Sequence, residues 1–304
     1  MSATVPAPIG VIGHYNLLER LEPAGPGDLY RARDTRLGRT VVVRVLPPTF
    51  ARDARARTAL FEKVRTLVAL SHPNLVTLFD AGEHDGQVYF VFEFLAGQPL
   101  RAEMSGRPMN VRRAMDLAIQ MADAVAEAHA RGFFHSGLSP DSIVITTKGH
   151  AKIPAFELAT RAGFDRSAAD VRLHDYDSPE EALGHEPDER ADIHSVGAVL
   201  YEMLTTRRPL HRGASAPSAS NRHVPSEVDE IVLRAIAPNP ASRIQTAVAL
   251  AAQLRTAAAV LDARGGVGDE PEAGEHAPTV SRVLVLTVAI LIVLGAVIWW
   301  WVPR

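Results

Sequence analysis

Hydrophobic positions in the first third of the chain follow two different periods. Short runs of β-branched and aromatic residues at 41–43 and 88–92 are bounded by turn residues, which is typical of strands. Between them, residues 54–70 carry apolar side chains at spacings of three and four, which indicates one face of a helix. Its apolar positions are Leu60, Val64, Leu67 and Val68. The pattern predicts a small β-rich unit that contains a helix.

Beyond Pro108 the apolar positions predict mostly helix. Asn110 is a suitable N-cap for a helix that runs to Arg131, and Gly132 would terminate it. Helical spacing resumes near Ser226, and its apolar positions are Val228, Ile231, Val232 and Ala235. A β-rich lobe over about 15–95 is therefore expected before a larger helical lobe over about 96–260.

Composition shifts divide the rest of the chain. The expected parts are an N-terminal tail at 1–14, a folded domain at about 15–260, a linker at 261–281 and a transmembrane helix at 283–302. The linker is rich in glycine, proline and acidic residues, so little of it can be buried, and the sequence predicts a disordered juxtamembrane tether.

Residues 283–302 carry no charge over about twenty positions, the length that crosses a hydrocarbon core at about 1.5 Å per residue. The tryptophans at 299–301 lie at the end of this run, where indole rings favour the membrane interface. A buried core helix is the alternative, which the length of the run disfavours. Only Pro303 and Arg304 follow, and residues 1–12 hold no signal-like apolar run. We expect a single-pass tail anchor in the inner membrane with the folded domain in the cytoplasm.

Composition and charge remove several classes of function. Apolar residues make up 47% of the chain, which is enough for a sizeable core, and the formal net charge of −3 gives no reason to expect a nucleic-acid partner. The absence of cysteine excludes disulfides, thiolate metal sites and a cysteine nucleophile. The 12 histidines lack metal-ligand spacing such as H-E-x-x-H, which disfavours a zinc site.

One segment carries the most specific signal. Residues 135–143 read His-Ser-Gly-Leu-Ser-Pro-Asp-Ser-Ile, which resembles the catalytic loop H-R-D-L-K-P-x-N-I of a protein kinase. The framework positions of that pattern are kept at His135, Leu138, Pro140 and Ile143. The positions of the base, the catalytic lysine and the metal-binding asparagine hold Gly137, Ser139 and Ser142.

Further motifs follow in kinase order, and the chain resembles the bacterial serine/threonine protein kinases of the Hanks type over about 15–260. The matching segments are the glycine loop at 21–34, the lysine strand at 41–44, His-Pro-Asn at 72–74, the hinge at 93–95, K-I-x-D-F-G-x-A at 152–159, A-P-E at 178–180 and D-x-x-S-x-G at 192–197. The resemblance implies an α+β, bilobal protein-kinase-like fold. It also implies that Arg243 pairs with Glu180 in a buried ion pair.

The resemblance places a vestigial nucleotide pocket between the lobes. Its positions are Leu21, Gly27, Leu29, Val42, Arg44, Phe92, Glu93, Leu95 and Val144. Val42 replaces the usual alanine and would crowd an adenine ring, although ordinary core packing explains such apolar positions equally well. Leu67, His135 and Phe156 fall where the stacked core of an active kinase lies.

The phosphate- and metal-handling positions are the ones that depart from the family. Two glycine-loop positions are Glu22 and Ala24, and the strand lysine is Arg44, whose planar fork cannot simply copy an ammonium. The D-F-G aspartate position is Ala155, so neither metal-ligand position keeps its residue. The helix glutamate that pairs with the lysine falls near Lys63, or at Val64 if the register is shifted by one.

Three further positions complete the comparison. Glu157 replaces the D-F-G glycine and is one of two nearby carboxylates that could serve an unusual metal site. Asp141 is the other, and it more plausibly decorates the loop surface. Leu173 occupies the place of a supporting threonine. The partner-docking helix that these kinases carry between residues 205 and 226 looks deleted.

These losses favour a membrane-anchored pseudokinase that has no catalytic residues and acts as a scaffold or signalling regulator. We expect no cofactor, although weak, metal-independent ATP binding remains open. The expected partners are a cytosolic protein, either an active kinase or its substrate, and the membrane through the C-terminal helix. The alternative is a divergent active serine/threonine kinase with weak or unusual ATP use, which would rely on Glu157 and Arg44.

Overall fold

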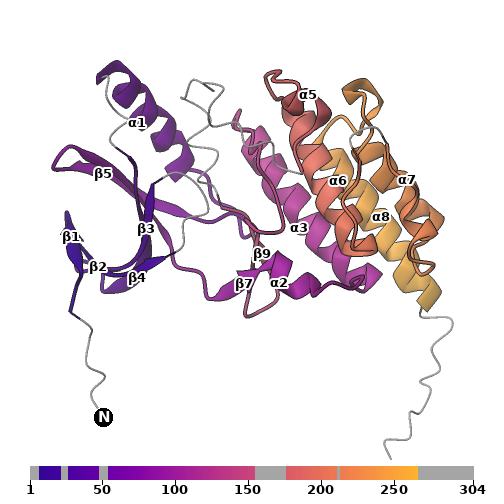
Figure 1. The fold of residues 1–304 in the computed structure, drawn as a ribbon, viewed down its shortest axis with the longest axis horizontal. Helices are drawn as coiled ribbons and strands as arrows, with labels where there is room; N and C mark the ends of the chain where they lie inside the picture. Colours follow the sequence, from indigo (N-terminus) through magenta and orange to yellow (C-terminus); the bar gives the residue numbers. More distant parts are fainter. Residues whose placement is uncertain (1–6, 22–26, 48–53, 155–175, 211–212, 266–304) are drawn as a thin grey trace, which may run out of the picture. The chain divides into compact units, whose positions relative to one another are not determined.

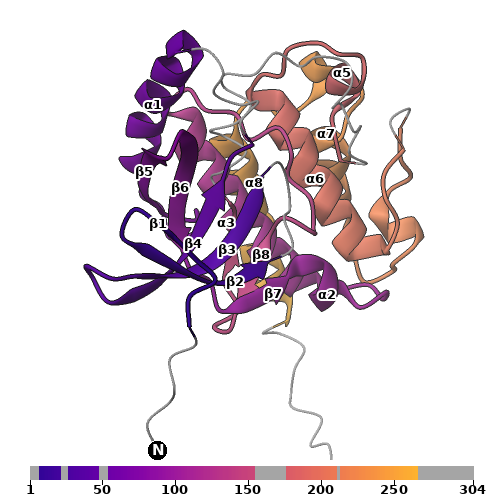
Figure 2. The same cartoon turned by 60° about the vertical axis from the view of Figure 1, so that its left-hand side comes forward.

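The computed structural model describes residues 7–21, 27–47, 54–154, 176–210 and 213–265. The N-terminal part of the chain, up to Glu93, forms a six-stranded antiparallel sheet in the order β1-β2-β3-β4-β6-β5. Its strands are β1 Gly10–Ile12, β2 Tyr15–Leu21, β3 Asp28–Asp34, β4 Arg39–Val45, β5 Leu78–His84 and β6 Gln87–Glu93. The helix α1 Ala54–Val68 lies beside β5 in both ribbon views (Figure 1, Figure 2).

The predicted strand runs form the centre of this sheet. β4 and β6 pair in register, with Val41 opposite Glu93 and Val45 opposite Tyr89. Alternate residues of β4 point into one buried cluster, which includes Val41, Val43 and Val91. This alternation is what a period of two produces when one face of a sheet is covered.

The predicted helix over residues 54–70 is confirmed as α1, although it ends at Val68, two residues earlier than predicted, and its apolar face needs one correction. Leu60, Val64 and Leu67 are buried, but Val68 is 43% exposed. Val68 is the last residue of α1, and the chain turns there through a hydrogen bond from Leu70 N to Leu67 O of 3.0 Å. Leu70, two residues beyond the end of the helix, is buried.

The second half of the chain is mostly helical, as the pattern predicts. Its helices are α2 Leu100–Met104, α3 Val111–His129, α5 Pro179–Ala182, α6 Glu189–Thr205, α7 Ser226–Ala235 and α8 Ala247–Gly265. Two 3-10 turns, η2 Pro217–Ala219 and η3 Pro240–Ser242, and a small sheet of β7 Gly97–Pro99, β8 Val144–Thr146 and β9 Ala151–Lys152 complete it. α6 contacts both α3 and α7, and its residues from Ala191 to Thr205 are all buried (Figure 1).

The signals that end the long helix α3 are confirmed. Asn110 is its N-cap, and its side chain accepts a hydrogen bond from Arg113 N at 3.1 Å. Gly132 follows the helix with a φ of +74°, a left-handed conformation that glycine adopts without strain.

A short segment ties the two halves together. Val76 N donates to Ile153 O and Ile153 N donates to Asn74 O, both at 2.8 Å. The side chain of Asn74 donates to Gln120 Oε1 at 2.9 Å and to Ala151 O at 2.8 Å. The His-Pro-Asn match is therefore a structural link between the lobes.

The structure describes only the first residues of the predicted linker and none of the predicted membrane span. α8 continues to Gly265, five residues into the stretch assigned to the linker, and the span at 283–302 lies outside the described residues. Among the helices that the structure describes, none combines the length and apolar character needed to cross a membrane.

Candidate functional site

The loop at residues 135–143 is held in place by a carboxylate beneath it. Asp192, which is fully buried in α6, accepts a hydrogen bond from His135 N at 2.7 Å and another from Ser136 N at 2.6 Å. His129 at the end of α3 adds a third contact, from Nε2 to Asp192 Oδ2 at 2.8 Å. A carboxylate that accepts several N–H groups fixes a backbone firmly. The aspartate of the D-x-x-S-x-G match is thus the anchor of the loop.

The framework positions of the loop are buried, as the resemblance implies. Leu138 and Ile143 are in the core, and Leu100 N donates to Ile143 O at 2.8 Å. His135 is also buried, and its Nε2 lies 3.0 Å from Pro154 O. The loop therefore keeps its fold without its usual chemical groups.

The two serines at the lysine and asparagine positions bond to each other. Ser139 N donates to Ser142 Oγ at 3.1 Å, and Ser142 Oγ donates to Ser139 O at 3.0 Å. Ser142 N also donates to Ser139 Oγ at 3.3 Å. Both hydroxyls are used to close the turn. Gly137 between the anchored residues has no side chain to orient a nucleophile.

Ser142, the described residue at a metal-ligand position, does not suit magnesium. This ion prefers octahedral oxygen ligands with at least one carboxylate, whereas Ser142 offers a hydroxyl that is already engaged. Within the described ranges, no group of three or more His, Cys, Asp and Glu side chains could hold a metal ion. Ala155, Phe156, Glu157 and Leu173 lie outside the described residues.

Asp141 is engaged on the surface, as expected. It accepts two hydrogen bonds from Arg101 of α2, from Nε at 3.2 Å and from Nη2 at 3.1 Å. Its side chain is mostly exposed.

The same arginine also contacts α6 within the helical lobe, which the sequence did not predict. Arg101 Nη1 donates to Glu202 Oε1 at 2.6 Å, and Arg101 Nη2 also donates to the hydroxyl of Tyr176, which in turn donates to Glu202. Burial and the hydrogen bond to Glu202 raise the pKa of Tyr176 to about 12. This Arg101 cluster, made of Arg101, Asp141, Tyr176 and Glu202, joins the loop to α2 and α6.

The predicted nucleotide positions on the sheet are brought together by strand pairing. Leu29 of β3 lies opposite both Leu21 of β2 and Arg44 of β4. Val42 lies opposite Phe92. Arg44 is buried, while Leu29 and Val42 are half-buried. A small cluster therefore exists where the resemblance implies a nucleotide pocket.

Of the three glycine positions in the family's loop pattern, Gly27 is the one that keeps glycine, and the backbone geometry requires it. Gly27 has a φ of +88°, and a Cβ there would lie 2.2 Å from Val45 O. No larger residue fits that close approach of two strands. Glu22 and Ala24 lie outside the described residues.

The hinge positions are tied to the helical lobe by an ion pair. Glu93 Oε1 lies 2.6 Å from Lys152 Nζ and also accepts from Thr77 N at 2.8 Å. Leu95 is half-buried just after the hinge, and Val144 lies in β8 opposite Pro99 and Lys152.

In the kinase family a glutamate of the helix that corresponds to α1 pairs with the strand lysine, whose position is Arg44 here. Glu62 of α1 does not take the role of that glutamate. Glu62 is exposed, and its Oε1 lies 3.5 Å from Arg65 Nη1 one turn along the same helix. The side chain of Lys63 lies outside what the structure describes.

The predicted ion pair between Glu180 and Arg243 is confirmed. Arg243 Nη1 lies 2.5 Å from Glu180 Oε1, and Nη2 lies 2.6 Å from Oε2. Burial alone would raise the pKa of Glu180, but the hydrogen bonds and charge of Arg243 outweigh it and hold that pKa below the usual range.

The region between α6 and α7 agrees with the expected loss of a docking helix. Between Thr205 and Ser226, the described residues hold the short turn η2 as their regular structure. Ser218 N in that turn donates to Asp229 of α7 at 2.9 Å. Residues 211–212 are not described.

Comparisons with known proteins agree with this geometry. Residues 18–254 match the sequence family described as the protein kinase domain. The chain is 30% identical to a probable serine/threonine-protein kinase, SCO3848, of Streptomyces coelicolor, over 86% of this chain and 44% of the relative. It is 32% identical to the serine/threonine-protein kinase PknB of Mycobacterium tuberculosis, over 79% of this chain and 42% of that protein. The chain thus spans less than half the length of these relatives.

A solved structure shows the same fold. The crystal structure of the Mycobacterium tuberculosis PknI kinase domain superposes with a TM-score of 0.66 at 21% identity, covering 84% of this chain and 99% of that domain.

Proposed function

The chain belongs to the bacterial serine/threonine protein kinase family, and we propose that within this family it is a pseudokinase, a domain that keeps the kinase frame but does not transfer phosphate. It acts as a scaffold or signalling regulator at the cytoplasmic face of the membrane. No cofactor is required for this role, and any ATP binding is weak and independent of metal.

One observation carries the proposal. Asp192 anchors the loop at 135–143 as a well-formed element. Within that loop, Ser139 and Ser142 are hydrogen-bonded to each other. Phosphoryl transfer depends on positioning and on charges that neutralise the phosphates. Losing one acid or base group typically lowers a rate by roughly 10²–10⁴-fold. Several such groups are missing together, while the fold around them is intact.

The proposed place of action follows from the apolar run at 283–302. Its length and its terminal tryptophans suit a membrane span. The acidic residues at 261–281 would be repelled by anionic lipid head groups, so the domain would stand off the surface. The domain would then hold a cytosolic protein, either an active kinase or its substrate, near the membrane.

Phosphate transfer from radiolabelled ATP tests the proposal. The full chain in detergent micelles is incubated with magnesium or manganese, alone and with a generic protein substrate, beside the variant Arg44→Ala. We expect no incorporation above that of the variant, because base, lysine and metal positions are all replaced. Metal-dependent incorporation that disappears in Arg44→Ala would instead identify a divergent active serine/threonine kinase.

A further inference from the structure

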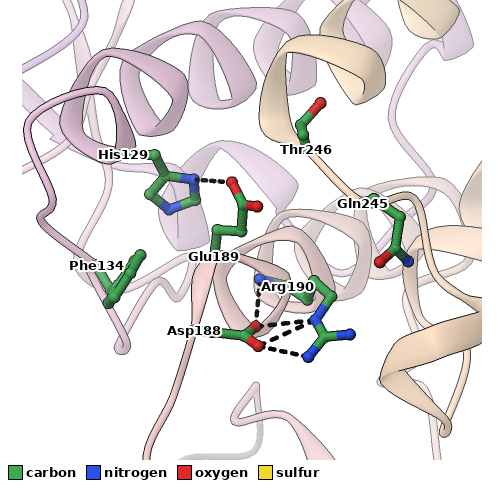
Figure 3. Close-up of a pocket in the computed structure, with 7 residues that line it drawn as sticks. All are labelled: His129, Phe134, Asp188, Glu189, Arg190, Gln245 and Thr246. Atoms are coloured by element: carbon green, nitrogen blue, oxygen red, sulfur yellow. Dashed lines mark hydrogen bonds and ion pairs between the residues drawn. The ribbon is translucent and has the colours of Figure 1, made fainter.

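A pocket of about 420 Å³ lies where the end of α3 meets the start of α6, and none of the predicted nucleotide positions lines it (Figure 3). Its lining residues are His129, Phe134, Asp188, Glu189, Arg190, Gln245 and Thr246. The volume falls within the range of about 300–1,000 Å³ that is usual for small-ligand sites. Its polar groups decide what it can bind.

The charges in the pocket do not cancel. The carboxylate of Asp188 is already engaged by Arg190. It accepts hydrogen bonds from Arg190 N at 2.9 Å and from the Arg190 guanidinium at 2.6 Å and 3.0 Å. Glu189 is different. Its side chain is 42% exposed, and the partner that the described contacts give it is His129 Nδ1 at 3.8 Å. That distance is beyond a hydrogen bond. One carboxylate therefore remains available to a ligand.

His129 supplies a second, independent sign of a missing donor. Its side chain is only 7% exposed, and Nε2 faces the Asp192 carboxylate, which can only accept. Nδ1 has no hydrogen-bond partner among the described residues. It faces the Glu189 carboxylate across the wall of the pocket at 3.8 Å, beyond the reach of a hydrogen bond (Figure 3). The Glu189 carboxylate is therefore left to accept from a donor group that enters the pocket.

The opposite side of the pocket also offers acceptors. Gln245 Nε2 donates to Arg243 O at 2.6 Å and to Pro240 O at 3.1 Å, which leaves its amide oxygen for the pocket. That oxygen is on the side of the amide nearer Glu189 and Arg190 (Figure 3). Thr246 adds a hydroxyl. Phe134, 36% exposed, gives an aromatic surface beside His129, with the ring centroids 5.5 Å apart.

We propose that this pocket binds the guanidinium of an arginine side chain from a partner protein. A guanidinium carries five donors in a planar fork and no acceptor, so it can serve Glu189 and Gln245 together, and it stacks on aromatic rings such as Phe134. A lysine ammonium lacks the planar fork and the flat face that stacks on an aromatic ring, and an anion would be repelled by Glu189. The proposal adds a partner chemistry to the scaffold role and holds whether or not the chain transfers phosphate.

Blocked peptides test the specificity. The full chain in detergent micelles is titrated at pH 8 with acetyl-Ala-Ala-Arg-Ala-Ala-amide, and with the same peptide carrying citrulline, lysine or glutamate in place of arginine. Imidazole nitrogen shifts of His129, assigned with His129→Gln, report binding at the pocket. We expect the arginine peptide to shift them at the lowest concentration and citrulline, its neutral isostere, to have no effect. Equal effects of arginine and citrulline, or none from either, would overturn the proposal.

A matched pair of variants locates the site. Glu189→Gln should weaken arginine-peptide binding by roughly tenfold or more, the loss expected for one charge-assisted hydrogen bond. Glu186→Gln removes the same charge from an exposed position three residues earlier and should leave binding unchanged. Thermal unfolding checks that both variants are folded. Equal affinity of the two variants for the arginine peptide would refute the assignment. If Glu189→Gln does not fold, the comparison of the arginine and citrulline peptides on the unsubstituted chain tests the proposal instead.

Discussion

Replacing Arg243 by leucine should destabilise the domain strongly, because this guanidinium is completely buried and uses all five of its donors. Two bond to Glu180, and the others reach Ala237 O at 2.7 Å, Arg190 O at 3.1 Å and Pro238 O at 3.2 Å. Breaking a buried pair typically costs about 3–5 kcal/mol, because one charge is left without its partner. At about 2–4 °C per kcal/mol for a domain of this size, the unfolding midpoint should fall by roughly 6–20 °C.

The pH dependence of that loss gives an independent check. In the native protein the pKa of Glu180 is depressed, so its contribution to stability is present above its ordinary pKa and is lost as the pH falls through the lowered value. In Arg243→Leu the carboxylate is partly buried without a cation, and protonation relieves it. The difference in midpoint between native and variant protein should therefore shrink as the pH is lowered from 7 towards 4.

A surface pair serves as the control. Arg255 pairs with Asp123, but their side chains are 54% and 29% exposed, and such pairs are worth about 0–1 kcal/mol. Arg255→Leu should barely move the midpoint in differential scanning calorimetry. The double variant Glu180→Leu/Arg243→Leu should recover part of the loss, since no buried charge remains. If Arg243→Leu and Arg255→Leu shifted the midpoint equally, the reasoning about burial would be wrong.

Three further outcomes are expected. Asp192→Asn should lower the free energy of unfolding by about 2–4 kcal/mol in urea titration, because an amide cannot replace a carboxylate that accepts from two backbone N–H groups; an unchanged midpoint would contradict its anchoring role. Arg101→Ala should increase hydrogen exchange at residues 139–142 and at Tyr176 together. Exchange changes confined to α2 would contradict the role of Arg101 in joining these segments. Deletion of 281–304 should move the chain from the membrane to the soluble fraction with its unfolding midpoint retained, and persistent membrane association would remove the proposed anchor.

The fold could be predicted because its signals are local and regular. β-branched runs gave β4 and β6, and the cap at Asn110 and the stop at Gly132 bounded α3. The ordered motifs added the pairing of Glu180 with Arg243, which joins positions far apart in the sequence. Val68 was assigned to the wrong environment because helical spacing does not say where the helix ends, and α1 ends at Val68.

The contacts of the site could be predicted only in part. The Arg101 cluster joins α2, the catalytic-like loop, Tyr176 and α6, and no spacing rule connects those segments. The bonding of Ser139 to Ser142 depends on a turn geometry that the sequence does not specify. One local signal was available: Ser178 and Glu181 have the spacing of a capping box, and the structure shows both reciprocal hydrogen bonds.

Magnesium dependence of ATP binding tests the central claim most directly, namely that the kinase frame is kept while its phosphate and metal chemistry is lost. The unfolding midpoint of the full chain is measured with ATP alone, with ATP and magnesium, and with ATP and manganese. We predict weak or absent stabilisation that is the same with and without metal, because Ser142 and Ala155 stand at the metal positions. A metal-dependent stabilisation that reaches about 2.7 kcal/mol at a hundredfold excess over Kd would contradict the account.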